Sequence, residues 1–335
     1  MPLVAIAGGS SPGLGRSITQ AVVSTYPSGE WKPVILSRTS TLPSWAVNLP
    51  TSSLEIRKVD YTSQSSLESA LEGCHTVISV ILATDGTQSS SQIALLTAAI
   101  KVGCQRFAPS EWACGPAGAP KVNFMRTNSS VWAACENSSI EWARFNVGLF
   151  MNYFGIGCAA TEKGNESVAQ KKEDEACAGI DRHGDMADGS GSFLLSMASR
   201  TAEMPMKVDG VSFPRITLTE LGNMGEFVAA SLSLKKWERD MNIVGCTIRL
   251  DELLQLAKKI VGGAFEVKRL TRGELEEHLA SLSETDVLKR LWLELKLMYS
   301  NDTIGEGILE PVVNGLCPNV KPLDVETYLR RSWES

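Results

Sequence analysis

Histidine and clustered cysteine are what this sequence lacks most. It has three histidines among 335 residues, and its eight cysteines are scattered, with no C-x-x-C pair and no histidine at ligand spacing. Structural zinc sites are built from four such ligands, usually in closely spaced pairs. We therefore expect no metal site, and we expect the cysteines to be reduced thiols that pack as small apolar residues.

Positive charge and long apolar runs are scarce as well. Lysine and arginine total 32 against 38 aspartates and glutamates, a formal net charge of −6, without a run of basic residues. Nucleic acid and anionic membrane surfaces are therefore not expected as partners. No apolar stretch reaches the roughly 20 residues that cross a bilayer, and the sequence opens directly on a strand rather than on a signal peptide. These features predict a cytoplasmic protein.

Glycine, by contrast, is concentrated near the beginning of the chain. Residues 2–7 form a short apolar run typical of a buried parallel strand, and the periodicity after residue 13 predicts an amphipathic helix. The glycines between them follow the spacing G-x-x-x-G-x-G, which lets backbone approach a diphosphate at the helix N-terminus. A plain tight turn is the alternative. The predicted cofactor contacts of this turn are Gly9, Ser11, Gly13, Leu14 and Gly15.

Strands and helices then alternate along the chain. Strands are expected at 33–38, 54–59, 76–81, 106–109 and 140–147, and helices at 62–71, 91–102 and 128–137. Such alternation with short loops indicates an α/β fold with a doubly wound parallel sheet. Ligands of such sheets bind beyond the carboxyl ends of the strands. Asp60 and Ile81 are therefore expected on the same rim as the glycine turn, within the cofactor site.

The second strand ends in an arginine, at the point where the adenosine ribose of a dinucleotide is expected. An acidic residue there binds a ribose 2′-hydroxyl, whereas an arginine accommodates a 2′-phosphate. Arg38 and Thr39 follow the strand with no neighbouring carboxylate. The sequence therefore predicts NADP(H) rather than NAD(H) as cofactor; a solvated arginine at a strand end is the alternative.

The second half of the chain changes in composition. Residues 162–191 are polar and glycine-spotted, which predicts a solvated loop or lid. A strand is expected at 215–219, a helix at 220–234, and only helices over 250–261 and 273–298, with no strands between them. We predict a smaller, mostly helical C-terminal domain that forms the second wall of a cleft. The expected cofactor domain covers 1–155 completed by 206–245, and the expected substrate domain covers 156–205 and 246–335.

Six segments share their order and character with one known family. They are the glycine turn, L-S-R at 36–38, R-F-A-P-S-E-W at 106–112, N-V-G-L-F-M-N-Y-F at 146–154, residues 218–237 and residues 316–333. In them the chain resembles the NmrA-like and isoflavone reductase-like family of atypical short-chain dehydrogenases. The resemblance implies a Rossmann domain that binds NADP(H), a smaller substrate domain, and reduction of apolar, often aromatic, small molecules. The glycines of the turn, Arg38 and Thr39 match the family's cofactor positions.

The resemblance also implies where substrate binds. Phe150, Tyr153 and Phe154 match the family's wall near the nicotinamide and the substrate, with core packing as the alternative. Ser110 and Trp112, which follow the fifth predicted strand, complete the predicted substrate site.

The chain departs from the family at its catalytic lysine. Counting back from Glu136 puts Asn128 where family reductases carry lysine, and an amide cannot act as a titrating acid or base. No tyrosine begins a Y-x-x-x-K, so the dyad of the classical short-chain dehydrogenases is absent too. The remaining candidates for a proton donor are Lys121, Glu111 and His183. A structural carboxylate and a solvated loop histidine are the alternatives for the last two.

The sequence thus predicts an NADP(H)-dependent oxidoreductase that acts on a bulky, apolar small molecule in specialised metabolism. One alternative is a redox-sensing regulator that binds NADP(H) without turnover. Another is an enzyme that uses bound NADP(H) to shape a rearrangement or cyclisation with no net redox change. A monomer or a homodimer is expected; the substrate and the direction and face of hydride transfer are not specified.

Overall fold

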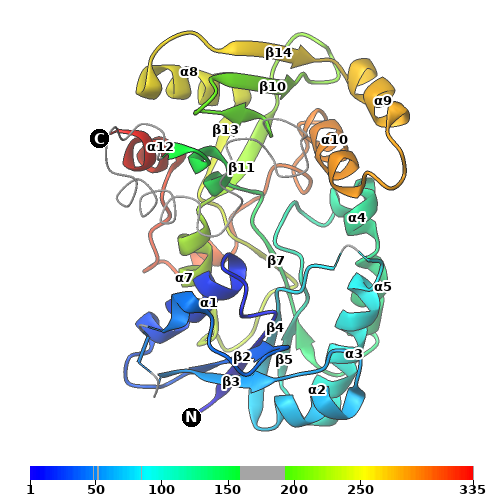
Figure 1. The fold of residues 1–335 in the computed structure, drawn as a ribbon, viewed down its shortest axis with the longest axis vertical. Coiled ribbons are helices and arrows are strands. Elements are labelled where there is room, and N and C mark those ends of the chain that lie inside the picture. Colours follow the sequence, from blue (N-terminus) through cyan, green and yellow to red (C-terminus); the bar gives the residue numbers. More distant parts are fainter. Residues whose placement is uncertain (48, 51–52, 84, 159–192, 335) are drawn as a thin grey trace.

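A six-stranded parallel sheet forms the N-terminal half of the molecule. In the computed structural model, which describes residues 1–335 except 48, 51–52, 84, 159–192 and 335, its strand order is β3-β2-β1-β4-β5-β6. The strands are β1 (Leu3–Ala7), β2 (Lys32–Ser37), β3 (Glu55–Lys58), β4 (Cys74–Ser79), β5 (Arg106–Ala108) and β6 (Glu141–Trp142). This order, reversing beside β1, is that of dinucleotide-binding folds. The predicted doubly wound sheet is confirmed (Figure 1).

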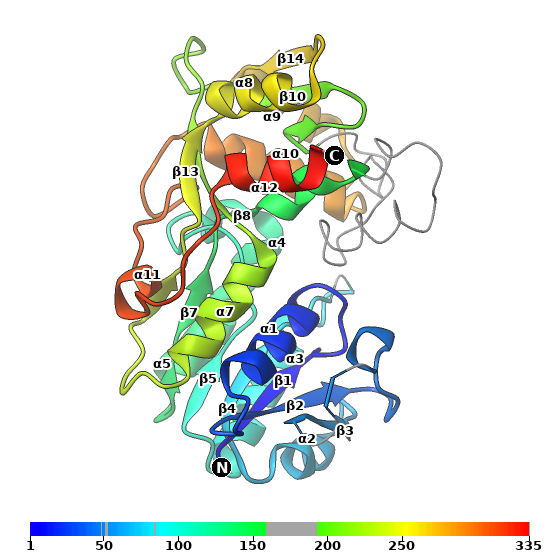
Figure 2. The same cartoon turned by 90° about the vertical axis from the view of Figure 1, so that its left-hand side faces the viewer.

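Helices cover both faces of this sheet. One face carries α1 (Leu14–Thr25) and α7 (Leu221–Ser231), which run side by side in both views (Figures 1 and 2). Their contact is close, because a Cβ added to Gly225 would lie 2.4 Å from the Ser17 hydroxyl oxygen. The opposite face carries α2 (Gln64–Leu71), α3 (Gln88–Lys101) and α5 (Ser129–Glu136), the last preceded by the short α4 (Asn123–Arg126). Each face encloses its own apolar core, since the strands between them are buried on both sides.

The strand predicted at 140–147 is two strands with different partners. β6 continues the large sheet beside β5, whereas β7 (Arg144–Asn146) pairs in parallel with β12 (Asp240–Asn242). The exchange occurs between neighbouring residues, because the Ala143 N–H donates to Phe107 O and the Arg144 N–H donates to Arg239 O. The segment was correctly predicted as extended, but its sequence carried no information about this change of partner.

Two small sheets and several helices form the other half (Figure 2). One sheet contains β8 (Leu149–Phe150), β11 (Arg215–Thr219) and β13 (Cys246–Arg249); the other contains β9 (Leu195–Ser196), β10 (Thr201–Pro205) and β14 (Glu266–Leu270). Around them lie α8 (Leu250–Val261), α9 (Arg272–Ser281), α10 (Val287–Tyr299) and α12 (Val325–Trp333), whereas α11 (Val313–Leu316) packs against α7 and β12. A third apolar core joins the small sheets to α8, α10 and α12, and a small separate cluster attaches α9 to α10. The region is helical as predicted.

The prediction that no strand separates the helices over 250–261 and 273–298 is wrong. β14 lies between α8 and α9 and pairs in parallel with β10. Of its five residues only Leu270 is buried, so the segment lacks the apolar pattern by which a strand is recognised. Its pairing comes from a strand more than 60 positions earlier in the chain.

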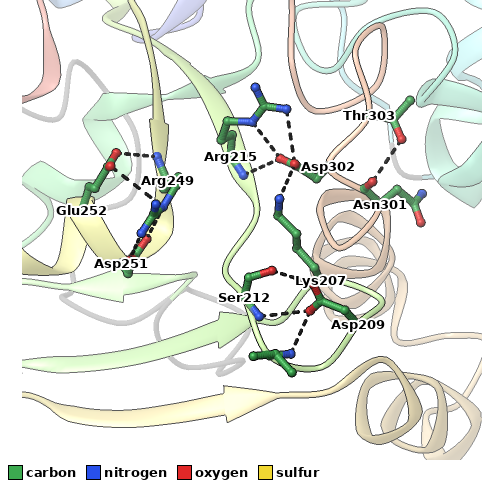
Figure 3. A network of polar contacts seen from close by, with 11 residues as sticks. Lys207, Asp209, Ser212, Arg215, Arg249, Asp251, Glu252, Asn301, Asp302 and Thr303 are labelled. Carbon is green, nitrogen blue, oxygen red and sulfur yellow. Dashed lines mark hydrogen bonds and ion pairs between the residues drawn. The ribbon is translucent and has the colours of Figure 1, made fainter.

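Asp302, just after α10, connects that end of the helix to the small sheet that contains β11. Its backbone has φ of +51°, and its carboxylate accepts hydrogen bonds from the Arg215 N–H and guanidinium and pairs with Lys207 at 2.6 Å (Figure 3). The start of β11 is thereby fixed to the loop that follows α10.

No helix of the described residues is both long and apolar enough to span a membrane.

Candidate functional site

A cavity of about 990 Å³ opens beyond the carboxyl ends of β1 to β4. Its walls come from the glycine turn, the end of β2, the segment after β3, and the segment that joins β4 to the first half of α3. Four predicted cofactor residues line it: Ser11, Arg38, Asp60 and Ile81. This is the position in which doubly wound sheets bind their ligands.

The glycine turn is folded so tightly that side chains could not replace its hydrogens. A Cβ added to Gly9 would lie 2.7 Å from Ile6 O, and one added to Gly15 would lie 2.4 Å from Gly9 O. The Gly15 N–H donates to the Ser11 hydroxyl at 2.9 Å, which closes the turn. Within the described residues, the N–H groups of Gly13 and Leu14 have no acceptor. Two unpaired N–H groups at the start of α1 suit an anionic ligand.

Arg38 is exposed at the cavity wall and forms no ion pair with any described residue. Asp60, which follows β3, also lines the cavity, but its carboxylate is engaged within its own turn. Its Oδ1 accepts hydrogen bonds from the Thr62 N–H at 2.9 Å and from the Thr62 hydroxyl at 2.7 Å. Those hydrogen bonds lower the pKa of Asp60 and keep it ionised. Thr39 donates its N–H to the Ser37 hydroxyl at 3.3 Å. The guanidinium of Arg38 is therefore available to a ligand's negative charge.

A buried polar cluster lies at the end of β5. The Ser110 N–H donates to Gln92 Oε1 at 2.6 Å, and Asn128 Nδ2 donates to Ser110 O at 3.3 Å. The Trp132 Nε1–H donates to Glu111 Oε1 at 2.6 Å. Burial raises the pKa of Glu111 to about 7, against the opposing effect of its hydrogen bonds from Trp132 and Asn128. Ser110, Glu111 and Asn128 are thus brought together, with Glu111 able to hold a proton near neutral pH.

Two amide groups of this cluster are only half satisfied. In the described part of the chain, three buried side-chain N or O atoms lack a hydrogen-bond partner, and Gln92 Nε2 and Asn128 Oδ1 are two of them. Gln88, one turn earlier on α3, uses both ends of its amide, accepting from the Ala83 N–H and donating to Ile81 O. An unpaired buried polar atom costs about 1–3 kcal/mol. The unpaired atoms of Gln92 and Asn128 therefore lower the free energy of unfolding, whereas the fully hydrogen-bonded amide of Gln88 does not.

Two other predicted candidates lie apart from this cluster. Lys121 forms a short ion pair with Glu306, which also accepts from Asn301 Nδ2 at 2.8 Å. The charge of its ammonium is therefore balanced by Glu306, which lies in the loop after α10. Trp112 is buried, donates its Nε1–H to Ser79 O at 2.8 Å and stacks on Phe145. It serves as a core residue between β4 and β5. His183 lies outside the described residues.

The predicted substrate aromatics divide into two groups. Phe154 is 1% exposed in the apolar core, where its carbonyl accepts from Trp333 Nε1. Phe150 and Tyr153 are part-buried, and Tyr153 meets Phe193 and Trp292 edge-on at centroid distances of 6.1 and 5.8 Å. Burial raises the pKa of Tyr153 to about 12, so its phenol stays protonated. Tyr153, Phe193 and Trp292 thus form an aromatic cluster at the apolar core of this half, with Phe193 buried and the other two part-buried.

Sequence reasoning missed two residues of the rim. Tyr61, next to Asp60, lines the cavity and hydrogen-bonds to Gly8 and Leu36; its place after the third strand was the available signal. Gln92 gave none, because a glutamine within a helix is ordinarily a surface residue. Among the described residues, no group of three or more histidine, cysteine, aspartate or glutamate side chains could hold a metal ion.

Comparison with known proteins extends the sequence resemblance. The model of the NmrA-like family matches residues 3–275. Oxidoreductase BOA1 of Botryotinia fuckeliana (strain B05.10) is 28% identical over 269 residues, which cover 78% of this chain and 77% of that protein.

Solved structures share the fold over nearly the whole chain. The complex of AtPrR2 with NADP+ and (+)pinoresinol is similar with a TM-score of 0.70 at 16% identity, over 98% of both chains. A ternary complex of leucoanthocyanidin reductase from Vitis vinifera gives 0.68 at 16% identity, over 99% of this chain and 100% of that one. The NADPH complex of the quinone oxidoreductase QOR2 from Escherichia coli gives 0.66 at 14% identity, over 97% and 98%. With its family model matched over most of its length, the chain belongs to the NmrA-like family.

Proposed function

We propose that the chain is an NADP(H)-dependent oxidoreductase that acts on a bulky, largely apolar small molecule. The observation that carries this proposal is the cavity at the sheet edge, which is bordered by the first residues of the glycine turn (Gly8, Ser10 and Ser11) and by the unpaired guanidinium of Arg38. The unpaired N–H groups of Gly13 and Leu14 follow in the same turn. Both are donors suited to phosphate groups, and Cβ atoms at Gly9 and Gly15 would obstruct the turn. The residues present therefore fit the cofactor.

In this proposal each part of the rim has a separate task. The N–H groups of Gly13 and Leu14 bind the diphosphate, and Arg38 binds the 2′-phosphate. When bound, the nicotinamide supplies or accepts the hydride. The chain itself orients the reactants, excludes water and holds a proton. Glu111 is our candidate for that proton, since burial places its pKa near 7.

The substrate is proposed to contact the aromatic side chains beyond β8. Phe150, Tyr153 and Trp292 are only part-buried, and the rings of Tyr153 and Trp292 pack against the buried Phe193. The solved structures named above include complexes with NADP+ and with NADPH, one of which also contains (+)pinoresinol. We extend the proposal to a substrate domain of 156–205 and 246–335, a cytoplasmic location and a role in specialised metabolism.

Replacement of Arg38 tests the cofactor assignment. R38A should weaken NADPH binding by about 1.5–3 kcal/mol, a loss of roughly 10- to 150-fold, because a charge-assisted phosphate contact disappears. NADH binding should barely change. Titration of both nucleotides against R38A decides the matter. R269A, which removes an exposed arginine of β14 in the other half of the molecule, is the control. Equal losses for NADPH and NADH in R38A would exclude the 2′-phosphate assignment.

A second candidate function is a dinucleotide-binding regulator without turnover. The observation that favours it is the state of Lys121, whose ammonium is paired with Glu306, together with the neutral amide at Asn128. A chain that only reports the redox state of its nucleotide needs no proton donor. The two functions are separated by mixing the NADPH complex with a panel of aromatic carbonyl compounds. Oxidation of NADPH in a single turnover supports the enzyme; binding without oxidation across the panel supports the regulator.

A further inference from the structure

One tyrosine hydroxyl joins the ends of two neighbouring strands at the cavity. Tyr61 Oη accepts a hydrogen bond from the Gly8 N–H at 2.8 Å and donates one to Leu36 O at 3.2 Å. Gly8 is the first residue after β1, and Leu36 lies in β2 directly opposite Ala7. The phenol comes from the segment after β3, so a third strand supplies the link between the other two.

This hydroxyl replaces one backbone hydrogen bond between β1 and β2 that is lost where the glycine turn begins. Gly8 has φ of +79°, a conformation that bends the chain away from β2 after the last pair, Ala7 with Leu36. The Gly8 N–H and Leu36 O would otherwise face the cavity without protein partners. Burial raises the pKa of Tyr61 to about 12, so the phenol keeps its proton and remains a donor at any physiological pH.

The two anchored segments carry the groups proposed to bind phosphate. Gly8 opens the turn that presents the N–H groups of Gly13 and Leu14, and Leu36 is two residues from Arg38. In NADP(H) the diphosphate and the 2′-phosphate belong to one molecule, so their binding groups must keep a fixed separation. We propose that Tyr61 is a positioning residue that holds the glycine turn and the Arg38 segment at the separation a 2′-phosphorylated dinucleotide requires. This inference rests on the proposed function.

The variant Y61F removes the hydroxyl and keeps the ring. In the protein without ligand, the Gly8 N–H loses its acceptor and should exchange with deuterium at least tenfold faster. NADPH should bind about tenfold more weakly, as expected for loss of two neutral hydrogen bonds that order its site. The preference for NADPH over NADH should fall about threefold in Y61F, and R38A combined with Y61F should show no further fall beyond R38A alone.

Tyr26 provides a matched control. Its hydroxyl also makes two hydrogen bonds, to Ala229 O at 3.0 Å and Ser233 Oγ at 2.8 Å, but it joins α1 to α7 away from the cavity. Y26F should lower the melting temperature as Y61F does and leave NADPH binding and Gly8 exchange unchanged. Thermal unfolding of both variants establishes that they are folded before binding is compared.

Each outcome decides between the two claims. Unchanged NADPH affinity in Y61F, or an equal loss in Y26F, overturns the role of Tyr61 and leaves the cofactor assignment intact. If the wild-type chain binds neither NADPH nor NADH, the proposed function fails and the role of Tyr61 toward that cofactor fails with it. Exchange at Gly8 in the ligand-free protein then still shows whether the hydroxyl anchors the turn.

Discussion

The rim of the large sheet has two halves that differ in how their polar groups are used. On the side of β1 and β2, the glycine turn leaves N–H groups without acceptors, and Arg38 forms no ion pair with the described residues. On the side of β5, Glu111 is bonded to Trp132, and Lys121 is paired with Glu306. The first half is built to receive charge from a ligand. The second half has neutralised most of its own charge before any ligand arrives.

This difference separates the proposed cofactor contacts from the residue at position 128. The groups proposed to bind phosphate follow β1 and β2, whereas Asn128 lies at the start of α5 beside Ser110. Asn128 bears instead on which groups of the β5 half can hold a proton. With Asn128 neutral and Lys121 occupied, Glu111 is the group there that can change its protonation near pH 7. The two halves can therefore be tested separately.

The largest effect is expected in the first half, at Gly15. A Cβ at this position would lie 2.4 Å from Gly9 O, and its three nearest atoms all belong to the Gly9 backbone, which cannot move aside as a flexible side chain can. G15A should reduce the free energy of unfolding by roughly 2–4 kcal/mol. NADPH binding should fall by about 100-fold or more, because the displaced turn no longer presents its N–H groups. Urea denaturation and NADPH titration measure the two losses.

Gly273 is the control for this substitution. It lies in the first turn of α9, and no atom is found within 4 Å of a Cβ added there. G273A should leave NADPH binding unchanged and stabilise the helix by up to about 1 kcal/mol. If G15A bound NADPH as well as G273A does, the close approach of Gly9 and Gly15 would have no part in the site.

A smaller effect, specific to pH, is expected in the second half at Glu111. Its pKa is raised from an ordinary value of 4.5 to about 7, so between these pH values the folded state binds more protons than the unfolded state. The free energy of unfolding of the wild type should therefore fall as pH rises from about 4.5 to 7. E111Q cannot ionise, and its stability relative to the wild type should increase by about 1–3 kcal/mol across this window. Denaturation at a series of pH values measures the slope.

The control is a glutamate at the end of α5 that, like Glu111, accepts a hydrogen bond from a tryptophan. Glu136 accepts from Trp142 Nε1 at 3.0 Å, but its side chain is 62% exposed and pairs with Arg239. E136Q should leave the pH slope as in the wild type. A wild-type slope that survives in E111Q would mean that Glu111 is ionised throughout and does not hold the proton we assign to it.

How far the fold can be predicted from sequence depends on whether a segment's environment is local. β1, β2 and β4 are largely apolar because helices cover both faces of the sheet, so their sequences alone indicate buried parallel strands. β14 has one buried residue in five, and the boundary between β6 and β7 is a change of partner. Neither feature leaves a pattern within its own segment.

The same distinction applies to the rim. The glycine turn and Arg38 follow directly from their strands, and the structure brings both to the carboxyl edge. The occupation of Lys121 depends on Glu306, which is 185 residues away, and the anchoring of Gly8 depends on Tyr61, 53 residues away. Contacts over such separations require the folded chain. Residues that belong to a sequence motif could be predicted. Their distant hydrogen-bond and ion-pair partners, which alter the charge or position of these residues, could not.

The smallest effect is expected at Asn128. Its Nδ2 makes a long hydrogen bond to Ser110 O at 3.3 Å, the side chain also hydrogen-bonds to the Glu111 carboxylate, and its buried Oδ1 has no partner. N128A removes these hydrogen bonds together with the unsatisfied oxygen, so the change in the free energy of unfolding should be below about 1 kcal/mol. NADPH affinity should change less than threefold, since the phosphate-binding groups lie in the other half of the rim. Turnover should also be nearly unchanged, because the proton is assigned to Glu111. A complete loss of turnover with NADPH binding intact would show instead that the amide itself acts on the reactants. The residues at the end of β5 would then take part in the reaction instead of only lining the site.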